Sequence, residues 1–183
     1  MKIANFGGNV TFTPRNYYTP KSEDEVLAIL NKHKNGKIRV ASSLHCWSDA
    51  VISEDVLINL KFLNAVQMEN DKNGGILVTA QGGIVLKDLL KYLRAHSNVT
   101  LPTMGGITRQ TIAGVVSTAT HGSGKSSISH YMEEIRVAAY DEKTGEAKIY
   151  RLTEGKELKA ARCALGCMGV ILSVTFRAAP QYW

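Results

Sequence analysis

The chain of 183 residues has few cysteines and no apolar run long enough to cross a bilayer. Its most apolar uncharged stretch, Cys163 to Val174, is far too short for a membrane span. The N-terminal residues lack the apolar segment of a secretion signal, so we expect no signal peptide and a cytoplasmic location. Three cysteines, an odd number, argue against a disulfide framework and for a reducing compartment.

Metal-binding and nucleic-acid-binding patterns are also missing from the sequence. Cys163 and Cys167 form a single C-x3-C pair, which is a poor zinc signal, so we expect two buried thiols on one helix face and no metal site. The net charge is +6, but the basic residues form no stripe with interleaved aromatics, so no nucleic-acid partner is expected. A modest positive field suits a cofactor that carries phosphate.

The patterning predicts an α+β fold in two subdomains that divide near residue 60. Ser22 and Glu25 read as a capping box that opens a helix, and Gly36 should end it. We expect strands at 37–41, 56–60, 76–81 and 170–176, helices at 84–95 and 111–119, a hairpin of 135–140 with 147–152, and a helix from Thr153 that holds Leu158 and Leu165. Strands 37–41 and 56–60 are expected to pair in parallel.

The first segment with an unusual composition is Ala41 to Asp49, which places small hydroxyl residues around His45 at the end of a predicted strand. A turn at a strand end exposes consecutive backbone N–H groups, and such a nest binds phosphate oxygens well. The alternative is a polar loop with a partly buried histidine. Taken alone, this segment favours the polar loop.

The second segment, Leu101 to Gly124, is rich in glycine and hydroxyl residues. The glycines remove side chains where a ligand would approach the backbone closely, and the threonines and serines supply hydrogen-bonding groups. An apolar ring system with a diphosphate-linked tail would fit such a surface. The alternative is a tightly packed helix of small residues.

Ala119 to Ser126 comes close to the P-loop pattern G-x-x-x-x-G-K-[ST] and makes nucleoside triphosphate binding through Lys125 and Ser126 a further hypothesis. Against it, alanine stands at the first glycine position, and Asp141 follows Lys125 too closely for a P-loop helix and the strands after it. No G-x-G-x-x-G follows a predicted strand, so a Rossmann-type site is not expected.

Taken together and in order, several segments resemble the FAD-binding domain (PCMH-type) of the vanillyl-alcohol oxidase flavoprotein family, with the sugar-1,4-lactone and alditol oxidases as the nearest branch. The family begins with Asn-Trp-(Ala/Gly)-Gly-Asn and later has a strand ending in Gly-Ser-Gly-His-Ser. It continues with Leu-Pro-Asn-Leu-Gly-Ser, a Thr-to-Gly run containing Thr-His-Gly, and Ala-Leu-Gly-x-Leu-Gly. The matching stretches here are 5–9, 42–46, 101–106, 111–122 and 164–171.

The resemblance implies a small parallel β-α-β subdomain at about 1–60 and a larger mixed or antiparallel sheet flanked by helices at about 61–183. It implies FAD as the cofactor and places a diphosphate loop on Ala41, Ser42, Ser43, Leu44, His45, Cys46 and Trp47. Flavin-lining positions fall on Gly105, Gly106, Thr111, Gly114, Ser117, Thr118 and His121, with a backbone contact near Ile171. For His121 the alternative is a histidine that holds a turn.

In the lactone and alditol oxidases the loop histidine is bonded to the flavin 8α-methyl, and His45 stands at that position. An imidazole nitrogen is a competent nucleophile, and such a bond would fix the cofactor and raise its potential. The loop departs from the family because Ser42 and Leu44 replace glycines and Cys46 replaces serine. We therefore expect Leu44 to sit in a conformation, φ > 0, that favours glycine.

The resemblance further implies an oxidoreductase in which the CH–OH group of a polyol or sugar lactone loses hydride to flavin N5. Family members continue into a cap domain that forms the substrate pocket. The sequence ends at Trp183, where the FAD-binding domain would end, so we expect this cap to be absent and assign no catalytic residue. A degenerate, non-enzymatic module that binds a partner chain is the alternative of a different class.

Overall fold

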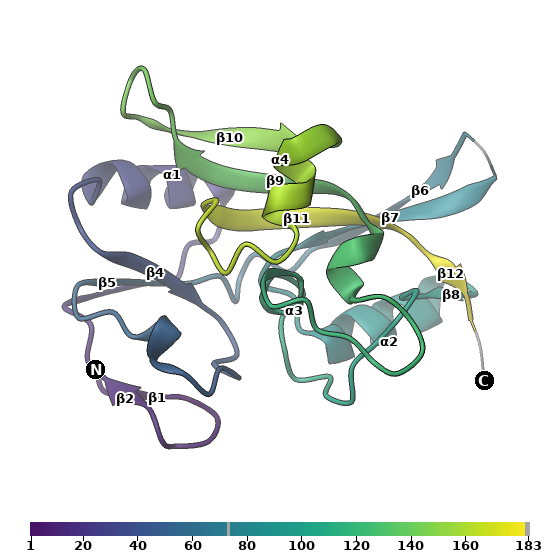
Figure 1. The fold of residues 1–183 in the computed structure, drawn as a ribbon, viewed down its shortest axis with the longest axis horizontal. Coiled ribbons are helices and arrows are strands. Elements are labelled where there is room, and N and C mark those ends of the chain that lie inside the picture. Colours follow the sequence, from purple (N-terminus) through teal and green to yellow (C-terminus); the bar gives the residue numbers. More distant parts are fainter. Residues whose placement is uncertain (73, 182–183) are drawn as a thin grey trace.

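Two sheets with different strand directions organise the chain (Figure 1). The computed structural model describes residues 1–72 and 74–181. The smaller sheet is parallel and has the order β3 (Asn16–Tyr18), β5 (Val56–Asn59), β4 (Ile38–Ala41). The predicted parallel pairing of the segments that became β4 and β5 is therefore confirmed, and β3 is a strand that the pattern did not predict.

Helix α1 (Glu23–Lys32) connects β3 to β4 and begins at the predicted cap. The Glu25 N–H donates to the Ser22 hydroxyl at 3.1 Å, while the Glu25 carboxylate accepts from the Lys21 N–H at 2.7 Å. The helix ends at Lys32, earlier than the expected Gly36, because the His33 N–H closes the last turn onto Ile29 and Leu30.

The larger sheet is antiparallel throughout, with the order β10 (Ala147–Leu152), β9 (Met132–Tyr140), β11 (Val170–Arg177), β7 (Gly75–Gln81), β6 (Val66–Asp71). The predicted hairpin is confirmed, with Tyr140 opposite Ala147 and Ile135 opposite Leu152. Edge strand β6 was missed, since only Val66 and Met68 of its six residues are apolar and the alternation is too short to predict a strand. The turn predicted before β7 includes Asn73, which lies outside the described residues.

Helices α2 (Leu86–His96) and α3 (Ile112–Ser117) cover the larger sheet and appear below β7 and β11 in Figure 1. Their buried residues pack with Val78, Val174 and Phe176 of the sheet in one apolar cluster. The remaining elements are the short pairs β1 (Ile3–Ala4) with β2 (Thr11–Phe12) and β8 (Val99–Thr100) with β12 (Ala179–Pro180), the 3-10 helices η1 (Asp49–Val51) and η2 (Ile128–Tyr131), and α4 (Gly155–Ala161).

Helix α1 joins the two sheets through a shared apolar core. Val26 and Leu30 of α1 are buried in one cluster with Val56 and Ile58 of the parallel sheet. The same cluster contains Ala138, Ala147, Val170 and Leu172 of the antiparallel sheet. Burial of this kind stabilises by roughly 25 cal/mol per Å² of apolar surface, so the core opposes separation of the sheets.

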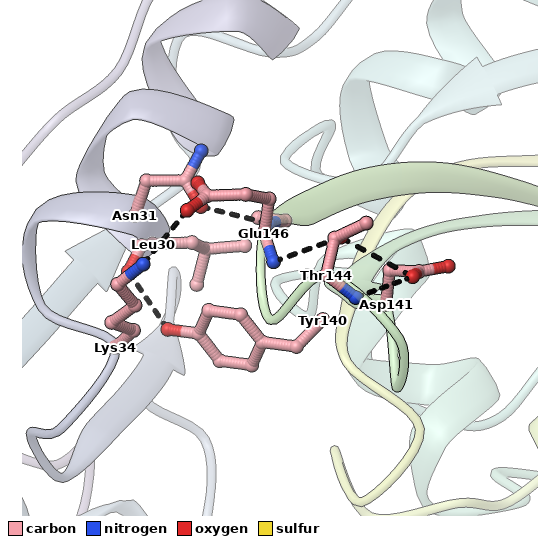
Figure 2. A network of polar contacts seen from close by, with 8 residues as sticks. Leu30, Asn31, Lys34, Tyr140, Asp141, Thr144 and Glu146 are labelled. Atoms are coloured by element: carbon pink, nitrogen blue, oxygen red, sulfur yellow. Dashed lines mark hydrogen bonds and ion pairs between the residues drawn. The ribbon is translucent and has the colours of Figure 1, made fainter.

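Polar contacts between α1 and the β9–β10 hairpin also hold the helix in one orientation (Figure 2). The Tyr140 hydroxyl donates to the Leu30 carbonyl at 2.8 Å, and the Ala147 N–H donates to the Asn31 side-chain oxygen at 2.7 Å. Lys34 and Glu146 form an ion pair at 2.7 Å. These bonds fix the rotation of α1 against the hairpin.

The segment after α4 differs from the prediction. The helix ends at Ala161 and does not hold Leu165, because Cys163 and Leu165 have left-handed φ values of 66° and 52°. Their N–H groups instead donate to Val116 and Ser117, at the end of α3. Cys163 and Cys167 are exposed, so the prediction of two buried thiols on one helix face was wrong.

In the part of the chain that the structure describes, no helix combines the length and the apolar character needed to span a membrane.

Candidate cofactor-binding site

A cleft of about 820 Å³ lies where the two sheets meet, and three separate segments form its walls. The segments are 38–46 after β4, 110–118 around α3, and 165–171 before and within β11. The lining residues are Leu30, Gly36, 38–46, Ser48, Ala50, Val51, Leu60, Gln110, Thr111, Ala113, Gly114, Ser117, Thr118, 138–140 and 165–171. The two segments singled out in the sequence therefore face one space.

The first wall is the loop that follows β4, and its conformation leaves donors available. None of the backbone N–H groups from Ser42 to Trp47 donates to another described residue. Leu44 adopts the expected left-handed conformation, with a φ of 53°. Consecutive unpaired N–H groups with adjacent Ser42 and Ser43 hydroxyls form the kind of concavity that accepts anionic oxygens.

His45 and Cys46 are the nucleophilic side chains of this wall, and both are partly buried. The His45 ring stacks on Phe6, with ring centroids 4.5 Å apart and an interplanar angle of 23°. Burial raises the pKa of the Cys46 thiol, which keeps the thiol protonated and weakly nucleophilic at neutral pH. The environment of the loop therefore does not activate the thiol as a nucleophile.

The second wall is formed by one face of α3 and the residue before it. Gly114 is exposed, and a Cβ placed there would meet only the Thr111 hydroxyl, at 3.2 Å. The Thr118 hydroxyl donates to the Gly114 carbonyl at 3.0 Å, which fixes that side chain beside the glycine. The absence of a side chain at Gly114 lets a planar ligand approach the helix backbone.

The third wall is the irregular segment between α4 and β11. Gly169 has a φ of 117°, and a Cβ there would lie 2.4 Å from the Ala138 carbonyl oxygen, so glycine is required. The Gly82 N–H donates to the Leu172 carbonyl at 2.7 Å, which ties the start of β11 to the turn after β7. Val170 and Ile171, the first residues of β11, thus line the cleft from a strand that is hydrogen-bonded on both sides.

Eleven of the fifteen predicted contact residues line this cleft, and Trp47, Gly105, Gly106 and His121 do not. Trp47 lies over Gly7 and is 65% exposed. Gly105 packs under the Thr120 side chain, and the exposed Gly106 has no atom within 4 Å of a Cβ built on it. The His121 Nδ1 lies 2.9 Å from the Gly122 carbonyl, which matches the alternative of a turn-holding histidine.

The P-loop hypothesis fails on local structure. A P-loop lies between a strand and the helix that follows it. Here the Ala119–Ser126 segment follows helix α3, and η2, a single 3-10 turn, comes after it. The Lys125 ammonium donates to the Pro102 carbonyl at 3.3 Å.

The cleft residues suit a ligand with a negatively charged centre and apolar ends. Arg39 is the one cationic side chain of the described lining, and no carboxylate contributes to it. The volume is of the size that proteins use for cofactors. The free N–H groups of the first wall and the glycine of the second fit the diphosphate and the planar ring of a flavin dinucleotide.

A family model described as "FAD binding domain" matches residues 14–146. The chain belongs to the FAD binding domain family. FAD is accordingly the cofactor of this domain, and the α+β fold with one parallel and one antiparallel sheet is the PCMH-type fold expected from the sequence.

Two curated relatives and one solved structure illustrate the relationship. A long-chain alcohol oxidase of an uncultured marine euryarchaeote is 46% identical over 97% of this chain and 37% of its own length. L-gulonolactone oxidase of Mus musculus is 30% identical over all of this chain and 41% of its length. A solvent-stable cholesterol oxidase shares the fold, with a TM-score of 0.85 at 23% identity over 98% of this chain and 37% of that protein. The chain thus spans about two fifths of these relatives' length.

Sequence reasoning missed several lining residues, including Arg39, Gln110 and Tyr140. It also took only Ile171 from the third wall, although Leu165 to Val170 line the cleft as well. A usable signal was present, since Gly166 and Gly169 lie within that segment and 164–171 matches the family. The resemblance nevertheless assigned to this stretch only the backbone contact near Ile171.

Proposed function

We propose that this chain is the FAD-binding part of an oxidoreductase that oxidises a CH–OH group, as in a polyol or a sugar lactone. Bound FAD supplies a hydride acceptor at flavin N5. The observation that carries the proposal is one cleft whose walls are the His45 loop and the glycine-containing face of α3, and to which no described residue contributes a carboxylate. The curated relatives named above are alcohol and lactone oxidases, which supports this class of substrate.

We assign the diphosphate to the loop Ala41–Trp47, where free N–H groups and two serine hydroxyls are available. The flavin-facing residues are proposed to be Thr111, Gly114, Ser117 and Thr118, with the backbone at Ile171. Gly106 belongs to the same proposal because the space over its backbone is open. Gly105 and His121 are proposed to support the turn beside it.

His45 is proposed as the point of covalent attachment to the flavin 8α carbon: the new C–N bond would replace one 8α C–H bond and the imidazole N–H bond, two protons would be released, and the flavin itself would take up the two electrons. Its ring lines the cleft, and the neighbouring thiol is held protonated, so the imidazole nitrogen is the available nucleophile. Attachment would keep the cofactor in place without relying on the affinity of the loop alone.

The division of the chain near residue 60 is part of the same proposal. Residues 1–60 would form the parallel subdomain that holds the diphosphate, and residues 61–183 the subdomain that faces the flavin. The three cysteines are unpaired, which supports a reducing, cytoplasmic setting for the protein.

The test is the mass of the intact purified chain, compared with that of His45→Ala. A parent chain heavier by one FAD, with a His45→Ala chain of unmodified mass that still binds FAD reversibly, is the expected result. A parent chain of unmodified mass after saturation with FAD would remove the covalent assignment. A chain that takes up no FAD at all would remove the cofactor site.

A further inference from the structure

The N-terminal hairpin, defined as residues 3–12, is closed by hydrogen bonds centred on Asn5. The Asn5 side chain is 5% exposed, accepts from the Val10 N–H at 3.0 Å and donates to the Asn9 side-chain oxygen at 2.8 Å. The Asn5 carbonyl accepts from the Gly8 N–H at 3.1 Å. The spacing Asn-x-x-x-Asn therefore closes a rigid turn and leaves other donors of the hairpin free to act elsewhere.

Those donors bind backbone carbonyls of the loop Ala41–Trp47, called the cofactor loop from here on. The Phe6 N–H donates to the Leu44 carbonyl at 2.9 Å. The Asn5 amide donates to the Cys46 carbonyl at 2.8 Å, and the Asn9 amide donates to the Trp47 carbonyl at 3.2 Å. The hairpin thus binds three carbonyl oxygens of a loop whose own N–H groups have no described partner.

Aromatic contacts complete the attachment. Phe6 stacks on the His45 ring, and Trp47 meets Phe6 edge-on with centroids 6.1 Å apart. Trp47 also lies so close to Gly7 that a Cβ there would be 2.3 Å from its ring. Every residue from Leu44 to Trp47 is therefore contacted by the hairpin through its carbonyl or its side chain.

We propose that Asn5, Phe6 and Asn9 are positioning residues of the cofactor loop, and that Phe6 sets the orientation of the His45 ring. Engaging the carbonyls on one side keeps the N–H groups free for phosphate oxygens. The same bonds hold Leu44 in its left-handed conformation, which persists only where the surroundings impose it. This inference rests on the proposed function, because it concerns how the same loop receives FAD.

The experiment uses the 183-residue chain carrying His45→Ala, which is expected to bind FAD reversibly and serves as the parent for affinity, and compares Asn5→Ala with Asn59→Ala in it. Asn59 also makes two side-chain hydrogen bonds, to Tyr17 and the Lys61 N–H, but does not line the cleft. If the loop adopts its FAD-binding conformation in only a fraction of the molecules, the apparent Kd for FAD rises by the inverse of that fraction. Asn5→Ala should weaken reversible FAD binding about tenfold, the loss expected from one to two buried hydrogen bonds, and Asn59→Ala should leave it unchanged.

The role of Phe6 is tested with Phe6→Leu, which removes the ring, and with the conservative Phe6→Tyr, which keeps it. The control is Phe62→Leu, which removes another exposed ring that lies outside the hairpin and the cleft lining. The readouts are the acid-stable flavin fraction and the NMR shifts of the His45 ring protons, which a stacked ring shields. Phe6→Leu should lose the shielding and attach flavin more slowly at saturating FAD. Phe6→Tyr should restore both, and Phe62→Leu should change neither.

The outcomes separate this inference from the proposed function. If the parent chain binds FAD but never attaches it, the affinity and the His45 shifts still decide the role of the hairpin. If the parent binds no FAD, the His45 shifts in Asn5→Ala and Phe6→Leu, both made with His45 intact, decide it. Unchanged His45 shifts in both variants, or an Asn5→Ala affinity equal to that of the parent, would overturn the inference.

Discussion

Leu44 is the loop residue whose backbone conformation is least favourable for its residue type. A left-handed φ costs an ordinary L-residue roughly 1–2 kcal/mol, and glycine avoids that cost. The Leu44 side chain offsets part of it by packing against the cluster of Ile3, Val10 and Val51. The loop therefore combines local strain with support from the hairpin.

Replacing Leu44 with glycine and with alanine separates these two effects. Both variants lose the packing of the side chain, but only glycine relieves the backbone strain. We expect Leu44→Gly to be more stable than Leu44→Ala by about 1 kcal/mol, as measured by urea unfolding. Equal stabilities, or a more stable alanine variant, would contradict the strain at this position.

Two glycines outside the His45 loop should respond in opposite ways to an added methyl group. At Gly83 a Cβ would lie 1.8 Å from the Leu60 carbonyl oxygen, whereas at Gly106 it would meet no atom of the described residues within 4 Å. Gly83→Ala should lose roughly 3 kcal/mol or more of stability. Gly106→Ala should keep its stability within about 0.5 kcal/mol but weaken FAD binding. A Gly106→Ala chain with parental FAD affinity would remove that residue from the proposed flavin surface.

At the scale of elements, the contact between α1 and the β9–β10 hairpin determines how the two sheets meet. Tyr140 belongs to this contact and also lines the cleft, so it connects the packing of α1 to the cofactor site. The bidentate pair between Arg136 and Glu23, at 2.7 and 2.8 Å, fixes the other end of the helix.

Tyr140→Phe removes one hydrogen bond from this contact and keeps the ring. We expect a loss of about 1 kcal/mol in stability, together with a measurable rise in the Kd for FAD by fluorescence titration. Tyr150→Phe is the matched control, because its hydroxyl bonds to Asp141 within the hairpin. If both variants bind FAD like the parent, the α1 contact does not set the geometry of the cleft.

The turn of the β9–β10 hairpin carries a pH-dependent contribution. The Lys148 ammonium, and then the Thr144 N–H, hold the pKa of Asp141 well below its usual range. Since the folded-state pKa is the lower one, the stabilisation is complete above the ordinary pKa of about 4 and is lost as the pH falls below it. Asp141→Asn should be less stable than the parent at pH 7, and the gap should close in acid. A gap that stays constant down to pH about 2 would rule out this linkage.

Sequence patterns predicted those elements that are defined by residues close together in the chain. The cap at Ser22, the apolar stripe of α2 and the alternation of β9 and β10 are visible in the sequence. Strand β6 was missed although its partner β7 is next in the chain, because only Val66 and Met68 of its six residues are apolar. The 163–169 segment was missed because its contacts are distant in the sequence. Cys163 and Leu165 adopt left-handed conformations only because the end of α3 accepts their N–H groups.

At the scale of the whole molecule, the cleft exists because two sheets meet at an angle fixed by α1, and each sheet contributes one wall. The sequence placed eleven of fifteen predicted residues in that cleft. Of the third wall only Ile171 was predicted, since the irregular 165–169 segment has no secondary-structure pattern and its place beside the cleft depends on contacts distant in the sequence. Because the chain belongs to the FAD binding domain family, the ligand of this arrangement is FAD.

The central claim is that loops far apart in the chain bind one flavin dinucleotide. The most direct test is titration of the ¹⁵N-labelled 183-residue chain with FAD, followed by amide NMR. Signals from 42–47, 111–118 and 166–171 should shift together with a single Kd. Shifts confined to one of these segments, or centred on Lys125 and Ser126, would contradict this claim.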